Sequence, residues 1–265
     1  MHPSEQAQPE GGARAVFAAL AATDSDEAAL ARLAALITGP GDPAIERIKQ
    51  LMQPASPTPD SPSVPAPSPW KSPQERVLAA AACVGRLESV DHDYVEVVGT
   101  AWLVRPDVAV TRRRPVATAL NQLDRGERTL QIALGDDTSI VKVLEVLYLS
   151  PDCDLAFLRV APQPSHIELA TELDHHHDLA VLGPAGDPAE APAGSTAVAA
   201  GNWLVPGRLV EIAAQRLRHD CPGWPRGVGS PLIDLARGQA IGLALDGGTA
   251  LPAWLLRDRL DRLLR

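Results

Sequence analysis

The spacing of apolar residues divides the chain into three stretches, and the first of them has a helical pattern. From Asp24 to Thr38 apolar side chains recur at three- and four-residue intervals, the spacing of an amphipathic helix. Asp24 and Glu27 supply the two polar side chains of a helix start. Similar spacing predicts a short helix before this one and another after Asp42. We therefore predict a small α-helical module over residues 1–52.

The second stretch, residues 53–73, is rich in proline and serine. Its eight prolines favour an extended polyproline conformation, and such a segment does not fold into a packed core of its own. We predict a flexible linker that proteases cut readily, because an extended segment has few backbone hydrogen bonds to protect it.

The third stretch, residues 74–265, alternates short β-type runs with turn residues, which predicts a mainly β domain. The runs cover residues 95–104, 108–111, 129–133, 141–149, 154–160, 179–182, 196–200, 208–212, 231–234 and 239–245. Their density fits two packed barrels. Leu256, Leu260, Leu263 and Leu264 then follow helical spacing, which predicts an amphipathic helix at the end of the chain.

Three segments of this β-rich stretch carry recognisable motifs. Residues 99–111 read Gly-Thr-Ala-Trp-Leu-Val-Arg-Pro-Asp-Val-Ala-Val-Thr, residues 154–160 begin with Asp-Leu-Ala, and residues 227–231 read Gly-Val-Gly-Ser-Pro. In this order they resemble the segments around the catalytic histidine, aspartate and serine of trypsin-like serine peptidases. The likeness is closest to the bacterial glutamyl-endopeptidase branch and runs from about Glu75 to Arg265. It implies two six-stranded antiparallel β-barrels with a C-terminal helix.

The same resemblance places the three catalytic positions at Arg114, Asp154 and Val228. A valine side chain has no lone pair with which to attack a carbonyl carbon. Arginine, with a pKa above 12, cannot accept a proton as a general base at neutral pH. Only the aspartate is kept, so the resemblance implies a catalytically inactive homologue.

Asp154 without a histidine would be a carboxylate in need of a partner. We predict that the Arg114 guanidinium pairs with it, because a charge-assisted hydrogen bond offsets the burial of a charge. The alternative is that Arg114 points into solvent as part of the basic run from Arg112 to Arg114.

The resemblance also implies that a cleft for an extended peptide is retained. Its expected lining comprises His219, Arg226, Gly227, Val228, Gly229 and Ser230. We therefore expect a protein or an extended peptide as the partner. A different hypothesis is an active peptidase with an unorthodox residue set, in which Cys221 is the nucleophile and His219 the base.

Charge and composition narrow the choice of partners and of compartment. A net charge of −9 argues against nucleic acid, and no apolar run is long enough to span a membrane. We recognise no secretory leader at the start of the chain, and its three cysteines are an odd number that cannot all pair in disulfides, so we expect a cytoplasmic protein.

Residues 174–178 read Asp-His-His-His-Asp, yet nothing elsewhere completes a metal site with recognisable spacing. We expect neither a metal nor a cofactor.

The domain combination suggests a biological setting. Trypsin-like domains joined to small helical adaptor modules resemble parts of bacterial defence and signalling systems, which implies a protein-interaction role for residues 1–52. The chain has 21 arginines and three lysines, a bias typical of GC-rich bacterial genomes. In that setting we expect a binding or regulatory protein that acts as a partner, as a decoy, or as a substrate that is itself cleaved in its linker.

Overall fold

The computed structural model describes residues 72–92, 94–123, 128–135, 139–173, 178–185, 191–192, 194–198, 201–223 and 225–265. The predicted helical module and nearly all of the predicted linker lie outside these residues.

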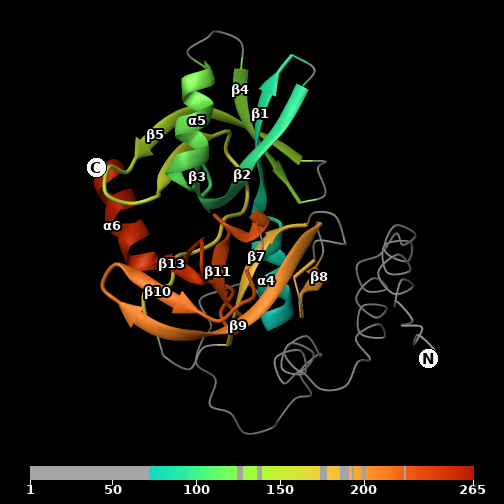
Figure 1. Cartoon of the computed structure of the whole chain (residues 1–265), viewed down its shortest axis with the longest axis vertical. Coiled ribbons are helices and arrows are strands. Elements are labelled where there is room, and N and C mark those ends of the chain that lie inside the picture. Colours follow the sequence, from blue (N-terminus) through green and yellow to red (C-terminus); the bar gives the residue numbers. More distant parts are fainter. Residues whose placement is uncertain are drawn as a thin grey trace, which may run out of the picture.

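Six antiparallel strands close the first barrel, which forms the upper half of the molecule in Figure 1. Their order is β1 (Val84–Asp91), β2 (Tyr94–Arg105), β3 (Val108–Thr111), β6 (Ala156–Val160), β5 (Ser139–Leu149) and β4 (Arg128–Leu134), with β4 pairing back onto β1. Apolar side chains that alternate along these strands fill the interior, among them Leu87, Trp102, Ile132 and Phe157, none of them exposed. The apolar residues of the predicted β-type runs therefore contribute to the interior of this barrel.

The second barrel is built from strands after residue 177. Its strands are β7 (Asp178–Pro184), β8 (Thr196–Val198), β9 (Asn202–Ala213), β10 (Arg216–His219), β11 (Pro231–Asp234), β12 (Ala240–Leu245) and β13 (Thr249–Pro252). The sheet order is β10-β13-β12-β11-β7-β9-β8, and an additional β10–β9 pairing closes six of the strands into a ring. The prediction of two six-stranded antiparallel barrels is thus confirmed.

Three helices accompany the barrels. The predicted C-terminal helix is present as α6 (Ala253–Leu263), which buries Leu256 and Leu260. Two others were not predicted, namely α4 (Pro73–Ala81) and α5 (Arg113–Leu123).

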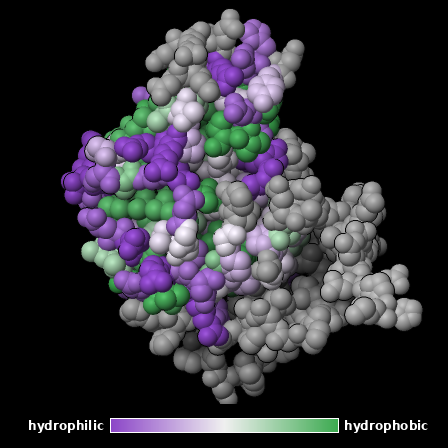
Figure 2. Space-filling model, viewed as in Figure 1, coloured by the Kyte–Doolittle hydropathy of each residue, from purple (hydrophilic) through white to green (hydrophobic). Residues whose placement is uncertain are grey.

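No described helix has the length and the apolar run needed to cross a membrane. Figure 2 shows hydrophilic side chains gathered along the edge of the molecule where α6 lies.

The helix α4 begins inside the segment that the sequence assigned to the linker. Ser72 and Glu75 form a capping box, in which each side chain accepts a hydrogen bond from the other residue's backbone N–H, and Pro73 occupies the first helical position. Residues 72 and 73 therefore belong to this helix and its cap rather than to the predicted linker. Asn202 at the start of β9 donates a buried 2.9 Å hydrogen bond to the carbonyl oxygen of Ala81, which ties the end of α4 to the second barrel.

Candidate functional site

The three predicted catalytic positions lie where the two barrels meet. Arg114 is in the first turn of α5, directly after β3, and Asp154 comes shortly before β6, so both belong to the first barrel. Val228 follows a short 3-10 helix, η2 (Pro225–Gly227), of the second barrel. The Thr100 hydroxyl of β2 donates a 2.8 Å hydrogen bond to the carbonyl oxygen of Arg226. This contact fixes the turn that carries Val228 against the first barrel.

Asp154 is held by two groups of the arginine run. The Nε atom of Arg112 donates to one carboxylate oxygen at 2.7 Å, and the backbone N–H of Arg114 donates to the other at 2.9 Å. The side chains of Arg112 and Asp154 are only 15% and 17% exposed. Asp154 thereby satisfies one of the amide groups that lack a partner in the first turn of any helix.

The predicted ion pair between the Arg114 side chain and Asp154 is wrong. The partner is Arg112, two residues earlier, and the Arg114 side chain is exposed. The reason is geometrical: the backbone amide of Arg114 points at Asp154, so its side chain leaves the helix in another direction. Sequence spacing marks a basic run near an aspartate but cannot tell which guanidinium reaches it.

Arg112 also connects the two barrels. Its Nη2 atom donates at 3.0 Å to Asp246, which follows β12 in the second barrel and lies 134 residues further along the chain. The Arg112 side chain passes close to Gly229, because a Cβ atom added to that glycine would lie 3.6 Å from the Cγ atom of Arg112. Gly229 has a φ of +93°, a backbone conformation that favours glycine. Sequence reasoning missed the roles of both Arg112 and Asp246.

Val228 borders a hollow in the second barrel with a volume of about 420 Å³. The lining comprises Val181, His219, Pro222, Gly223, Gly227, Val228, Ala244, Leu245, Asp246, Gly247 and Gly248. The structure thus brings three of the predicted cleft residues together, namely His219, Gly227 and Val228. Ser230 does not line the hollow. None of its surface is exposed, so it cannot contact a peptide, contrary to the prediction. Arg226 is exposed beside the turn, and Gly229 is buried under Arg112.

His219 and Cys221 lie in different surroundings although only Asp220 separates them in the chain. His219 is 8% exposed and borders the hollow, and burial lowers the pKa of its imidazole against the opposing effects of the Thr249 backbone and Asp220. Cys221 packs in the core of the second barrel beside Gly207. Burial raises the pKa of the Cys221 thiol to about 12, so the reactive thiolate is scarce at neutral pH.

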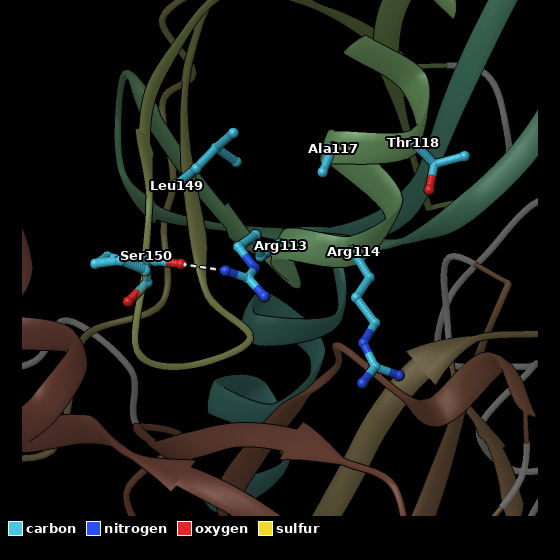
Figure 3. A pocket seen from close by; sticks show the side chains of 7 residues that line it. Arg113, Arg114, Ala117, Thr118, Leu149 and Ser150 are labelled. Carbon is cyan, nitrogen blue, oxygen red and sulfur yellow. Dashed lines mark hydrogen bonds between the residues drawn. The ribbon is translucent and has the colours of Figure 1, made fainter. Parts of the chain in front are cut away.

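A second hollow, of about 490 Å³, lies in the first barrel next to the arginine run. Figure 3 shows its lining, which comprises Arg113, Arg114, Ala117, Thr118, Leu149, Ser150 and Pro151. Arg113 and Arg114 extend from the first turn of α5, and Arg113 donates a 3.0 Å hydrogen bond to the carbonyl oxygen of Ser150. One hollow lies in each barrel: Arg113, next to Arg112 in the chain, lines the first, and Asp246, the second-barrel partner of Arg112, lines the other.

The histidine-rich run at 174–177 lies outside the described residues. Among the residues that the structure does describe, no three histidine, cysteine, aspartate or glutamate side chains gather in a way that could hold a metal ion.

Comparisons with known proteins agree with this architecture. The family model of the trypsin-like peptidase domain matches residues 99–243. The Rv3671c protease from M. tuberculosis in its active form is similar, with 22% identity, a TM-score of 0.53, and coverage of 80% of this chain and 94% of that one. A serine endoprotease from Yersinia pestis is similar at 14% identity and a TM-score of 0.52, over 75% of this chain and 68% of that one. At such identities the likeness concerns the fold. No curated protein matches the sequence.

Proposed function

The chain belongs to the trypsin-like peptidase family, and we propose that it is a catalytically inactive member that binds a protein segment without cutting it. One observation carries this proposal. The Asp154 carboxylate, which would orient a catalytic histidine, is instead bound to the Arg112 guanidinium and to the backbone of Arg114. Both carboxylate oxygens are therefore already engaged.

The residue types at the other two positions support the proposal. Acyl transfer needs a side chain that can attack the carbonyl carbon and a base that can take its proton. Val228 offers no nucleophilic atom, and the residue at position 114 is an arginine rather than a histidine, a residue type that is not used as a general base. Loss of the serine or of the histidine alone lowers kcat by about 10⁶ in the well-studied subtilisin case.

The surroundings of Cys221 count against the alternative of a cysteine peptidase. Its thiol is 4% exposed and packs among apolar side chains, whereas His219 faces the hollow. A nucleophile must reach the substrate as a thiolate, and burial raises the pKa of this thiol to about 12. An apolar core position is the ordinary setting of a structural cysteine.

Two hollows of the site support the proposal of peptide binding. They have volumes of about 420 and 490 Å³, within the range of ordinary ligand sites. An extended segment of a partner protein fits a surface of this kind, because alternate side chains can enter separate hollows while the backbone lies between them.

The remaining parts of the proposal rest on sequence resemblance. The helical module over residues 1–52 serves as an adaptor for another protein, and the chain acts in the cytoplasm as a regulator in a bacterial defence or signalling system. The predicted linker is then a candidate cleavage site. The likeness to the glutamyl-endopeptidase branch belongs to the same set of proposals.

Inactivity is tested by exposing the full chain to a fluorophosphonate probe and to a panel of peptide esters. We expect neither labelling nor turnover above that of the Cys221→Ala variant, and trypsin treated in parallel serves as the positive control. Stoichiometric labelling, or turnover that Cys221→Ala abolishes, would overturn the proposal. Capture of partners from the native host by the wild type, compared with the hollow-blocking variant Val228→Arg, then tests the binding role.

A further inference from the structure

We propose that the hollow beside α5 accepts an anionic side chain, a carboxylate or a phosphoryl group, from an extended peptide bound between the barrels. This inference rests on the proposed peptide-binding function and adds the chemistry of the residue that is recognised. It concerns the hollow of Figure 3, bordered by α5 on one side and by residues 149–151 on the other.

The hollow has an uncompensated positive charge. Two of its lining residues, Arg113 and Arg114, carry guanidinium groups, and no acidic residue is among the described residues that line it. Arg113 donates to the carbonyl oxygen of Ser150, a neutral group that leaves its charge unchanged. The Arg114 side chain is exposed, and among the described residues only its backbone amide has an acidic partner.

The acidic residues closest in sequence to the hollow are already engaged elsewhere. Asp154 accepts hydrogen bonds from Arg112 and from the backbone of Arg114. Asp152 accepts from Arg259 and from the Ser150 hydroxyl. Neither carboxylate is therefore free to neutralise Arg113 and Arg114, so an incoming anion competes with no acidic side chain among the described residues.

The hollow suits a single anionic side chain better than a polyanion such as a nucleic acid. Arg113 is held in place by its hydrogen bond to Ser150, which lowers the entropy lost when it binds a ligand. Arg114 is free to close over the anion, and guanidinium groups bind carboxylate and phosphoryl oxygens through paired donors. The chain as a whole carries a net charge of −9, which disfavours a nucleic acid.

A positional-scanning library tests this inference directly. The full chain is immobilised and presented with ten-residue peptides, acetylated and amidated at their ends, in which each position in turn is fixed as one amino acid, phosphoserine included. We expect one position to select Asp, Glu and phosphoserine over Asn, Gln and Ser by about threefold to fivefold, the range of a solvent-exposed ion pair.

The charge-reversed variant Arg114→Glu distinguishes recognition from a general effect of charge. We expect it to shift the preference at that position to Lys and Arg while apolar preferences at other positions persist, which also shows that the variant is folded. Arg216→Glu in β10 is the matched control, because it changes the net charge equally at an exposed arginine of the second barrel. It should leave the acidic preference unchanged.

The outcomes distinguish peptide binding itself from the recognition of an anionic side chain. A wild-type chain that selects no residue at any position would refute peptide binding itself. Selection without an acidic preference, or an acidic preference that Arg114→Glu and Arg216→Glu alter equally, would overturn this inference alone. A preference for phosphoserine without Asp or Glu would restrict the anion to a phosphoryl group and support the site.

Discussion

Three consecutive arginines have three different roles at the junction of the barrels. Arg112 bridges two carboxylates, Arg113 binds a backbone carbonyl group, and Arg114 contributes its amide while its side chain is exposed. The differences follow from their positions at the end of a strand and in the first turn of a helix. There the chain changes direction at each residue, and consecutive side chains diverge.

The ion pair of Arg112 should contribute more to stability than Arg114 does. Removing one partner of a buried pair leaves an uncompensated charge, and because the pair here is partly exposed we expect Arg112→Ala to lower the free energy of unfolding by about 2 kcal/mol. The exposed Arg114→Ala should change it by less than about 0.5 kcal/mol. Urea denaturation of the two variants provides the measurement.

A double-mutant cycle with Asp154→Asn supplies the control. In that background most of the effect of Arg112→Ala should disappear, because the only carboxylate that then loses Arg112 is Asp246, whose side chain is 68% exposed and contributes little. Additive effects of the two changes, or a larger loss for Arg114→Ala, would contradict the assignment.

Two buried thiols predict a loss of stability at alkaline pH. Burial raises the pKa of both Cys83 and Cys221 from the ordinary value of 9.0 to about 12. Between pH 9 and pH 12 the two thiols release their protons in the unfolded chain but retain them in the folded chain. The folded state therefore loses stability as the pH rises above 9. Each thiol should contribute a decrease of about 1.4 kcal/mol per pH unit in the free energy of unfolding.

The measurement is urea denaturation between pH 8 and pH 10.5 for the wild type and for the variant with Cys83→Ala and Cys221→Ala. The variant should show a clearly smaller decrease with pH than the wild type. Equal slopes would show that the two thiols ionise as readily in the folded chain as in the unfolded one.

At the level of the elements, the structure contains segments that the periodicity of the sequence did not reveal. The strands β1, β10 and β13 and the helices α4 and α5 were all missed. The strand β10 reads Arg-Leu-Arg-His and so has a single apolar residue, and the strand β13 reads Thr-Ala-Leu-Pro and ends in a proline, so neither has the run of apolar and β-branched residues that indicates a strand. The start of α4 does carry a signal, the Ser72 and Glu75 capping box, but the prolines before it favoured a linker.

The missed strand β1 closes the first barrel through a close contact at Gly85. A Cβ atom added to this residue would lie 2.2 Å from the carbonyl oxygen of Ala133 in β4. We expect Gly85→Ala to lower the free energy of unfolding by at least about 2 kcal/mol, because the two backbones would have to separate. Thermal denaturation followed by circular dichroism measures the effect.

Gly223→Ala is the matched control, since nothing lies within 4 Å of its added Cβ atom. The control should change stability by less than about 0.5 kcal/mol. Equal effects of the two glycine substitutions would mean that the close approach of β1 and β4 does not limit the packing of the barrel.

At the level of the whole molecule, the two barrels are joined by contacts far apart in the sequence. Arg112 links the first barrel to Asp246, and α4, which precedes the first barrel, is bonded to Asn202 of the second. Val77, Ala80 and Ala81 of α4 are buried. The helix therefore packs as part of the folded domain, and we propose that the domain begins near Ser72.

Truncation tests this boundary. A fragment of residues 72–265 should unfold with a cooperative transition, and a fragment of residues 84–265 should be less stable by about 3 kcal/mol, because it loses apolar burial and leaves the Asn202 amide without its partner. Limited proteolysis of the full chain should first cut between Gln53 and Ser72. Early cuts within the barrels, or equal stability of the two fragments, would contradict the boundary.

The sequence by itself determined the mainly β architecture, the terminal helix and the chemical character of Val228 and Arg114, because side-chain type and local period are read directly from neighbouring residues. Only the tertiary structure decided that Arg112 binds Asp154, that Ser230 is buried and that Cys221 lies in a core. These features depend on the direction in which side chains point where the chain turns. They also depend on contacts between segments that lie 40 to 134 residues apart in the sequence. Local periodicity carries no information about either.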